Sequence, residues 1–169
     1  SMTSSTPKKI EFSKDNITNY NDALSYCSYL EGIDIGAMVN QLDFKYDDPA
    51  VSKNSIDKKL KRISITYVNY QKDPDLDLIQ PAIAEINSLY SENPRNLNLN
   101  WDYFILSSIN RDYDSAFNCL HAYSLGSSSF NFWETQDFYI YLLGQTRFYD
   151  KLEELIRHFK STAKESTQL

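Results

Sequence analysis

Apolar side chains recur at steps of three and four residues along most of this chain, and that spacing most strongly constrains its fold. Residues 55–71, for example, carry on one helical face a series of apolar residues: Ile56, Leu60, Ile63, Tyr67 and Tyr70. Such a period is typical of amphipathic helices, whereas half-buried strands alternate every second residue. The chain also has four glycines and five prolines, few turn residues for an all-β fold. The sequence therefore predicts an all-α fold.

The pattern divides the chain into about eight helices joined by short loops. They are expected at residues 19–30, 33–44, 55–71, 79–90, 100–110, 113–123, 131–146 and 149–163. The β-branched run from Ile63 to Thr66 leaves a strand there as the rival interpretation. Because short connections make consecutive helices antiparallel neighbours, we expect stacked antiparallel helical hairpins, an α-solenoid.

Several helix ends carry their own signals. Asn54 or Ser55 can cap the helix at 55–71, and Asp112 can cap the helix at 113–123. Asn131 followed three residues later by Glu134 resembles a capping box. Pro81 is expected early in its helix, where a missing amide costs least.

The length of 169 residues fits one domain, and the ends differ in composition from the rest. Residues 1–12 are rich in Ser, Thr and Lys and are predicted to be disordered, with Ser1 before Met2 interpreted as a cloning remnant. Residues 13–163 are predicted to form a single helical domain. Residues 164–169 are predicted to be a polar tail.

Charge is distributed unevenly. Residues 73–150 hold three basic and eleven acidic side chains, net −8, whereas residues 1–72 and 151–169 are each net +1. Indiscriminate nucleic-acid binding needs a basic footprint, so the acidic balance argues against it. No apolar run approaches the roughly 20 residues that span a bilayer, which argues against membrane insertion. The basic cluster of residues 58–62 is interpreted as a solvated helix face, with a phosphate or acidic-partner contact as the rival interpretation.

Two stretches of the chain match each other at an offset of 36 residues. Arg-x-Tyr-Asp occurs at 111–114 and again at 147–150, and flanking positions match, with Tyr103 on Tyr139 and Leu106 on Leu142. Each unit would be a helix, a tight turn and a second helix. Two ordinary helical hairpins would give a similar pattern, so both interpretations stay open.

This pattern resembles the helix–turn–helix repeats of the tetratricopeptide and pentatricopeptide superfamily. The resemblance covers residues 101–160 and rests on Tyr113-Asp114-x-Ala116 and Tyr149-Asp150-x-Leu152. Leu152 stands where the family has a small residue, and other small residues at helix crossings are mostly absent. The resemblance implies stacked α-hairpins and a partner-binding surface, with no specific ligand.

Aromatic residues crowd the same half of the chain as the acidic ones. Residues 101–159 contain 15 of the 24 aromatics, and acids beside Tyr and Trp suit a basic or amphipathic segment of another protein. Those members of one set that stay exposed are predicted to contact the partner: Trp101, Tyr103, Trp133, Tyr139 and Tyr141. The rival interpretation is that aromatics fill the core while acids face solvent.

Chemistry-bearing residues form no recognisable constellation. His121 and His158 have no ligand arrangement around them, so no metal or cofactor is expected. Cys27 and Cys119 are interpreted as buried free thiols, and Cys119 and His121 point to different helix faces. No catalytic residue is predicted.

These observations lead to a non-catalytic adaptor or scaffold subunit of a larger complex. Free thiols favour a reducing compartment, the cytoplasm or nucleus, and the Asn, Ser, Tyr and Lys richness is typical of an AT-rich eukaryotic genome. RNA binding through helical repeats is the alternative, and an enzyme with unfamiliar residues is a third.

Overall fold

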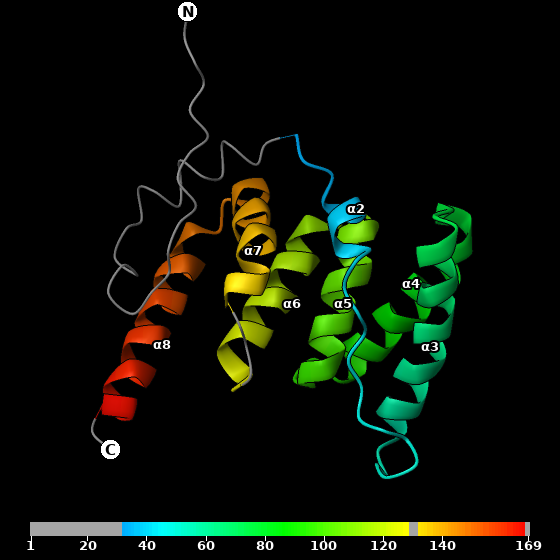
Figure 1. The fold of residues 1–169 in the computed structure, drawn as a ribbon, viewed down its shortest axis with the longest axis horizontal. Helices are drawn as coiled ribbons and strands as arrows, with labels where there is room; N and C mark the ends of the chain where they lie inside the picture. Colours follow the sequence, from blue (N-terminus) through cyan, green and yellow to red (C-terminus); the bar gives the residue numbers. More distant parts are fainter. Residues whose placement is uncertain (1–31, 129–131, 168–169) are drawn as a thin grey trace, which may run out of the picture. The chain divides into compact units, whose positions relative to one another are not determined.

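The computed structural model describes residues 32–128 and 132–167, with side chains at 132–134, 159–160 and 162–167 left out. Its described elements are seven helices and no strands, which confirms the all-α prediction (Figure 1). They are α2 (Ile35–Val39), α3 (Ser55–Lys72), α4 (Leu76–Glu92), α5 (Leu97–Ile109), α6 (Tyr113–Gly126), α7 (Phe132–Thr146) and α8 (Tyr149–Thr167). The helix expected at 19–30, the segment 1–12 and the Asn131 cap lie outside the described residues.

Local signals place most helix starts. Asn54 accepts a hydrogen bond from the amide of Ile56, and Asp112 accepts one from Ser115. Such side chains satisfy amides that the first helical turn leaves free. The β-branched residues 63–66 lie inside α3, so the helical period prevails over strand preference there.

Several helix boundaries differ from the sequence-based expectation: α4 begins at Leu76 rather than 79, α5 begins at Leu97 rather than 100, and α6 ends at Gly126 rather than 123. Helix α2 ends at Val39 rather than near residue 44, and the residues that follow have no regular secondary structure. Pro81 is the sixth residue of α4, beyond the first turn, so the helix loses one internal hydrogen bond. Helix α8 continues to Thr167, because Ala163, Lys164 and Glu165 all favour helix.

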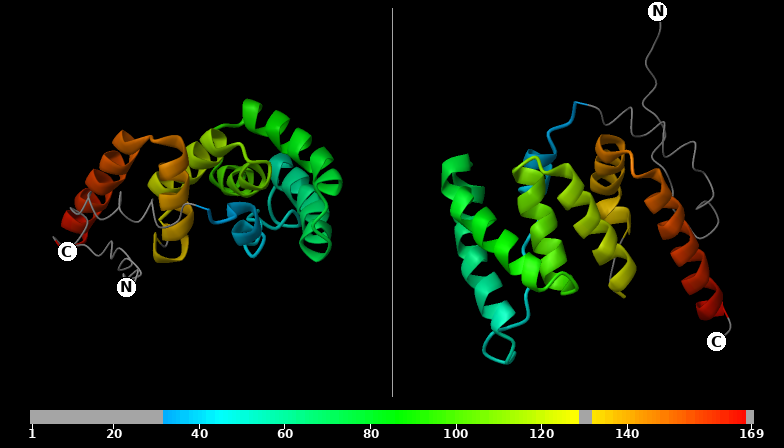
Figure 2. Two further views of the ribbon diagram at one scale, coloured as in Figure 1. Left: turned by 90° about the horizontal axis from the view of Figure 1, so that it is seen from above. Right: turned by 180° about the vertical axis from the view of Figure 1, so that it is seen from behind.

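The chain divides into two compact units. One is Asp34–Ser127, which contains α2 to α6, and the other holds α7 and α8. In the first unit α3 packs on α4, α4 on α5, and α5 on both α6 and α2. Figure 2, left, shows α4 and α2 on opposite sides of α5.

Helix α5 is the centre of the first unit. Every residue from Leu99 to Ile109 is buried, including the polar Asn100 and Asp102. A helix buried on all sides lacks a single apolar stripe, which fits its position between three neighbours. The functional consequence is that polar side chains of α5 meet other protein groups rather than water.

The turn after α5 has an unusual arginine. Arg111 has φ 59°; its amide donates to the carbonyl of Ser108, and that of Asp112 donates to Ser107. These two bonds form a Schellman motif, which usually has glycine at the left-handed position. Arg147, 36 residues later, has φ 60° and donates its amide to Leu143 at the end of α7.

The second unit is described through α7 and α8. Its buried side chains include Tyr139, Leu142, Leu152 and Leu155, and their matched positions in α5 and α6 are buried as well. Within the described ranges, each helix is too short or too polar to cross a membrane.

Candidate functional site

The structure buries most of the aromatic residues expected to contact a partner. Trp101 is 5% exposed, Tyr103 7%, Tyr139 0% and Tyr141 7%. The side chain of Trp133 lies outside the described residues. For the four described residues, the structure matches the rival interpretation, in which aromatics fill the core.

Tyr103 and Tyr139 are packed inside the protein. Tyr103 stacks on Tyr90 with ring centroids 4.7 Å apart, and its hydroxyl donates to Asn87 Oδ1 at 2.6 Å. Burial raises the pKa of both Tyr103 and Tyr139, and nearby carboxylates raise that of Tyr139 further. Tyr103 therefore joins α5 to α4 through its ring and its hydroxyl.

Trp101 contacts a segment of the chain that lies against helices α3 and α5. Residues 39–47, the docked segment, begin at the end of α2 and include the unstructured stretch after it. Figure 1 shows this cyan stretch running alongside α5. Its main chain is hydrogen-bonded by five side chains that we call the docking face: Asp57, Tyr67, Gln71, Trp101 and Asp102.

Side chains of α3 bind the first half of the docked segment through its main chain. The Tyr67 hydroxyl lies 2.9 Å from the carbonyl oxygen of Val39 and 2.7 Å from that of Leu42, and shares its proton between them. Gln71 Nε2 donates to the carbonyls of Asn40 and Leu42, at 2.9 and 3.2 Å. These bonds satisfy carbonyls that lack a helical partner after α2 ends.

The second half of the docked segment is bound mainly by α5. Trp101 Nε1 donates to the carbonyl of Asp43 at 2.9 Å, and the Lys45 amide donates to Asp102 Oδ1 at 2.6 Å. Further on, the Asp47 amide donates to Asp57 Oδ1 of α3 at 3.3 Å. Three amide or carbonyl groups of this second half are thus bound by side chains, without a β-ladder.

Two neighbouring side chains of the segment occupy different sites. Phe44 stacks on Tyr67 with centroids 4.7 Å apart and planes inclined by 23°. The Lys45 ammonium lies 4.4 Å from the centroid of Trp101 and 4.6 Å from that of Tyr123, and donates to the Tyr123 hydroxyl at 2.5 Å. We call Trp101, Asp102 and Tyr123 the lysine cage.

The lysine cage includes a deeply buried acid. Asp102 is 0% exposed, and burial raises the pKa of its carboxyl well above the usual value, although the Lys45 amide and ammonium lower it. Its Oδ2 is buried and has no hydrogen-bond partner among the described residues. The positive charge of Lys45 favours the ionised carboxyl and so offsets part of the effect of burial.

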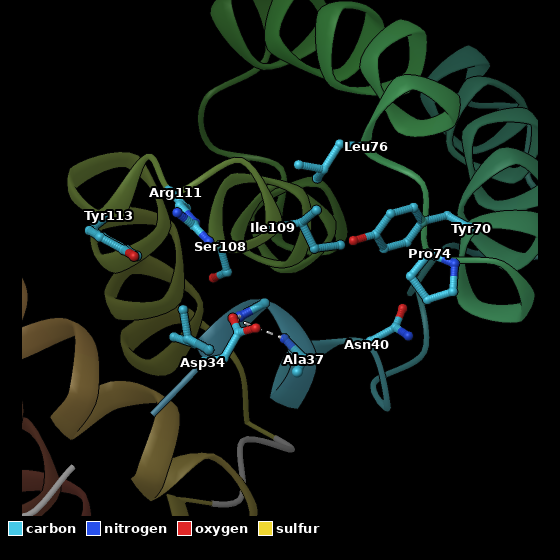
Figure 3. A pocket seen from close by; sticks show the side chains of 12 residues that line it. Asp34, Ala37, Asn40, Tyr70, Pro74, Leu76, Ser108, Ile109, Arg111 and Tyr113 are labelled. Carbon is cyan, nitrogen blue, oxygen red and sulfur yellow. Dashed lines mark hydrogen bonds between the residues drawn. The ribbon is translucent and has the colours of Figure 1, made fainter. Parts of the chain in front are cut away.

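A cavity of about 280 Å³ lies beside the docked segment, next to α2 (Figure 3). The start of α2 contributes Asp34, which caps the helix by accepting from Gly36 and Ala37, and the end of α5 contributes Ile109. Tyr70 and Pro74 line it from α3 and the following turn. Its wall is mixed polar and apolar and has no pair of groups arranged for acid–base chemistry.

The cysteine and the histidine that could carry chemistry, Cys119 and His121, are both buried in the helical core. Cys119 is a buried free thiol, as predicted, and burial raises its pKa to about 12. His121 is buried and stacks on Phe117 with centroids 5.8 Å apart. Across the residues that the structure describes, no three His, Cys, Asp or Glu side chains lie close enough to hold a metal ion.

Sequence reasoning named Trp101 but missed Lys45, Tyr67, Gln71 and Asp102 as members of one site. Lys45 falls between the helices predicted at 33–44 and 55–71, and Tyr67 belongs to the predicted apolar face of the second of them. The available signal was an acid, Asp102, inside α5, the most apolar of the helices that the structure describes in residues 55–167, because a buried acid requires a partner.

Comparison of the chain with protein families, with curated proteins and with solved structures found no match.

Proposed function

We propose that this protein is a non-catalytic adaptor or scaffold subunit that binds a basic or amphipathic segment of another protein. The observation that carries the proposal is the docking face, where helical side chains hydrogen-bond the main chain of an unstructured segment over residues 39–47. Recognition of main-chain groups suits peptides, because every peptide offers them. We further expect it to act in the cytoplasm or nucleus of a eukaryotic cell.

The chemistry of the lysine cage supports a basic partner. Trp101 and Tyr123 present aromatic faces to an ammonium group, and Asp102 supplies a carboxylate beside them. A cation over aromatic faces is stabilised most where water is excluded. Several carboxylates of the acidic stretch are exposed as well, including Asp77 and Glu92 of α4, and these would attract a basic segment to the surface.

An α-solenoid of about eight helices, resembling tetratricopeptide repeats, is the architecture we propose for the adaptor. Consecutive helices from α3 to α6 pack on one another, as in stacked hairpins. The left-handed Arg111 and Arg147 and the buried matched positions around them support a 36-residue repeat. Such stacks offer extended binding surfaces.

RNA binding by helical repeats is the second proposal, and the exposed basic cluster of α3 favours it. Lys58, Lys59 and Lys61 are exposed, whereas Arg62 pairs with Glu85 of α4 at 2.5 Å. Phosphate contacts by these lysines would give a steep dependence of affinity on salt.

Affinity purification of the tagged chain from cells, followed by mass spectrometry, tests the proposal. We expect a protein partner that survives nuclease treatment and is lost when Asp77→Lys and Glu92→Lys reverse charge on α4. Lys58→Ala with Lys59→Ala is the matched control and should retain the partner. Retention that depends on RNA, or on these lysines, would favour the second proposal instead.

A further inference from the structure

We propose that the docked segment is an exchangeable occupant of the docking face, and that a partner segment carrying an aromatic–lysine pair replaces it. This inference rests on the proposed adaptor function and names the class of partner. The chain's own Phe44 and Lys45 define what the face accepts. The partner is therefore an extended peptide with an aromatic residue followed directly by lysine.

The geometry of Phe44 and Lys45 sets this requirement. Phe44 stacks on Tyr67 of α3, while the Lys45 ammonium lies against Trp101 and Tyr123 of α5 and α6. Neighbouring side chains of an extended chain point to opposite sides, so one adjacent pair can reach both sites. An aromatic and a lysine at any other spacing would fill one site and miss the other.

The main-chain contacts permit replacement by a different sequence. The bonds from Tyr67, Gln71 and Trp101 go to carbonyl oxygens, and the bond to Asp102 comes from an amide. Any peptide in the same conformation offers the same groups in the same register. Specificity is thereby left to the two side-chain sites.

The docked segment is also built to leave its site. Phe44, Lys45 and Tyr46 are half-buried rather than buried, and Gln41, Asp47 and Asp48 around them are exposed. Residues 43–48 have no regular secondary structure, so releasing them breaks no helix or strand. Segments of this kind open more readily than the core helices beneath them.

A second cavity marks the edge where an incoming peptide would have room. It measures about 200 Å³ and is lined by Phe44 and Tyr46 of the segment and by Tyr67 and Val68 of α3. Val68 is 42% exposed, so this wall of the cavity is open to an incoming side chain. A bulkier aromatic side chain than Phe44 would fit against this wall.

A labelled peptide provides the direct test. The peptide consists of residues 39–48, and its binding to the full chain is followed by fluorescence anisotropy. In the wild-type chain the tethered segment competes at high effective concentration, so binding should be weak. The Lys45→Ala chain should bind the peptide about tenfold more tightly, because its own segment no longer fills the lysine cage.

Matched variants separate this effect from general loosening. Lys53→Ala, at an exposed lysine outside the docking face, should bind the peptide as weakly as wild type. A peptide with alanine in place of Lys45 should bind the Lys45→Ala chain about tenfold more weakly than the natural peptide. Phe44→Ser in the chain is a second opening variant, should Lys45→Ala prove poorly folded.

Equal binding of the natural and alanine peptides, or no binding to either opened chain, would overturn the inference. A wild-type dimer detected by light scattering and lost in Lys45→Ala would assign the face to a second copy, and would overturn it too. If no peptide binds while the affinity purification still recovers a partner, the exchange fails and the adaptor function stands.

Discussion

Lys45 and Asp102, 57 residues apart in sequence, are joined by a hydrogen bond in the lysine cage. The Lys45 amide donates to Asp102 Oδ1 at 2.6 Å, and the Lys45 ammonium lowers the pKa of the same carboxyl. Burial raises that pKa by more than Lys45 lowers it, so the pKa of Asp102 stays well above its usual value in the folded protein.

Asp102→Asn should raise the unfolding free energy relative to wild type, and this difference should grow as pH rises. A carboxyl whose pKa is raised on folding contributes most stability below its unfolded pKa of about 3.9, and loses it as pH rises through the folded pKa. The asparagine retains an oxygen for the Lys45 amide but has no charge to bury. Urea unfolding from pH 4 to 8 measures the difference between variant and wild type.

The expected difference in unfolding free energy grows with pH in favour of the variant. Asp73→Asn, at an exposed carboxylate, is the control and should show no such growth. A difference that stays constant with pH, or falls, would show that Lys45 fully compensates the buried charge.

Tyr67→Phe should release the docked segment while leaving the helices folded. The change removes the hydroxyl shared by the carbonyls of Val39 and Leu42, and losing a buried donor costs about 1–3 kcal/mol. Hydrogen exchange at the Lys45 amide reports the release, because that amide is bonded to Asp102 in the docked state.

Tyr70→Phe, one turn later on α3, is the control for this substitution. We expect it to leave exchange at Lys45 close to wild type, since Tyr70 lines the cavity beside α2 and, among the described residues, its hydroxyl does not hydrogen-bond the docked segment. Equal protection in wild type and Tyr67→Phe would show that the remaining bonds hold the segment unaided.

Arg111→Gly and Arg147→Gly should each stabilise the protein. A left-handed backbone costs a non-glycine residue about 1–2 kcal/mol, which glycine would relieve in the folded state. Glycine also has more freedom in the unfolded chain, and this offsets about 0.5–1 kcal/mol of the stabilisation. We expect a net increase of about 0.5–1 kcal/mol in unfolding free energy, similar at both sites. Chemical denaturation measures it.

Arg157→Gly is the control, because Arg157 is exposed within α8 and glycine there costs about 1 kcal/mol. If glycine raises the unfolding free energy at Arg111 and lowers it at Arg157, the gain at Arg111 comes from its left-handed backbone. A loss at Arg111 would mean that its side chain makes a contact worth more than the strain.

The helices were predictable because their signals are local. The stripe of apolar residues in α3, the Asn54 cap and the Asp112 cap each act within a few residues, and each appears in the structure. The docked segment was not predictable, because its bonds join residues far apart, such as Lys45 to Asp102. Trp101 could be singled out by type, but its burial depends on Lys45 and Asp43 arriving from elsewhere in the chain.

Gln136→Met should stabilise the protein, because the buried amide of Gln136, unlike that of Gln71 in the docking face, has no hydrogen-bond partner among the described residues. Gln136 is 0% exposed, and neither its Oε1 nor its Nε2 has a hydrogen-bond partner among the described residues. A buried polar group without a partner costs about 1–3 kcal/mol, and methionine fills a similar volume without that cost.

The same substitution at Gln71 should destabilise, because Gln71 Nε2 donates to the carbonyls of Asn40 and Leu42. Urea unfolding of both variants therefore compares one side chain in two settings. We expect Gln136→Met to gain about 1–3 kcal/mol and Gln71→Met to lose about 1 kcal/mol. A loss at Gln136 would reveal a polar contact made by its amide, and would place a functional polar group inside α7.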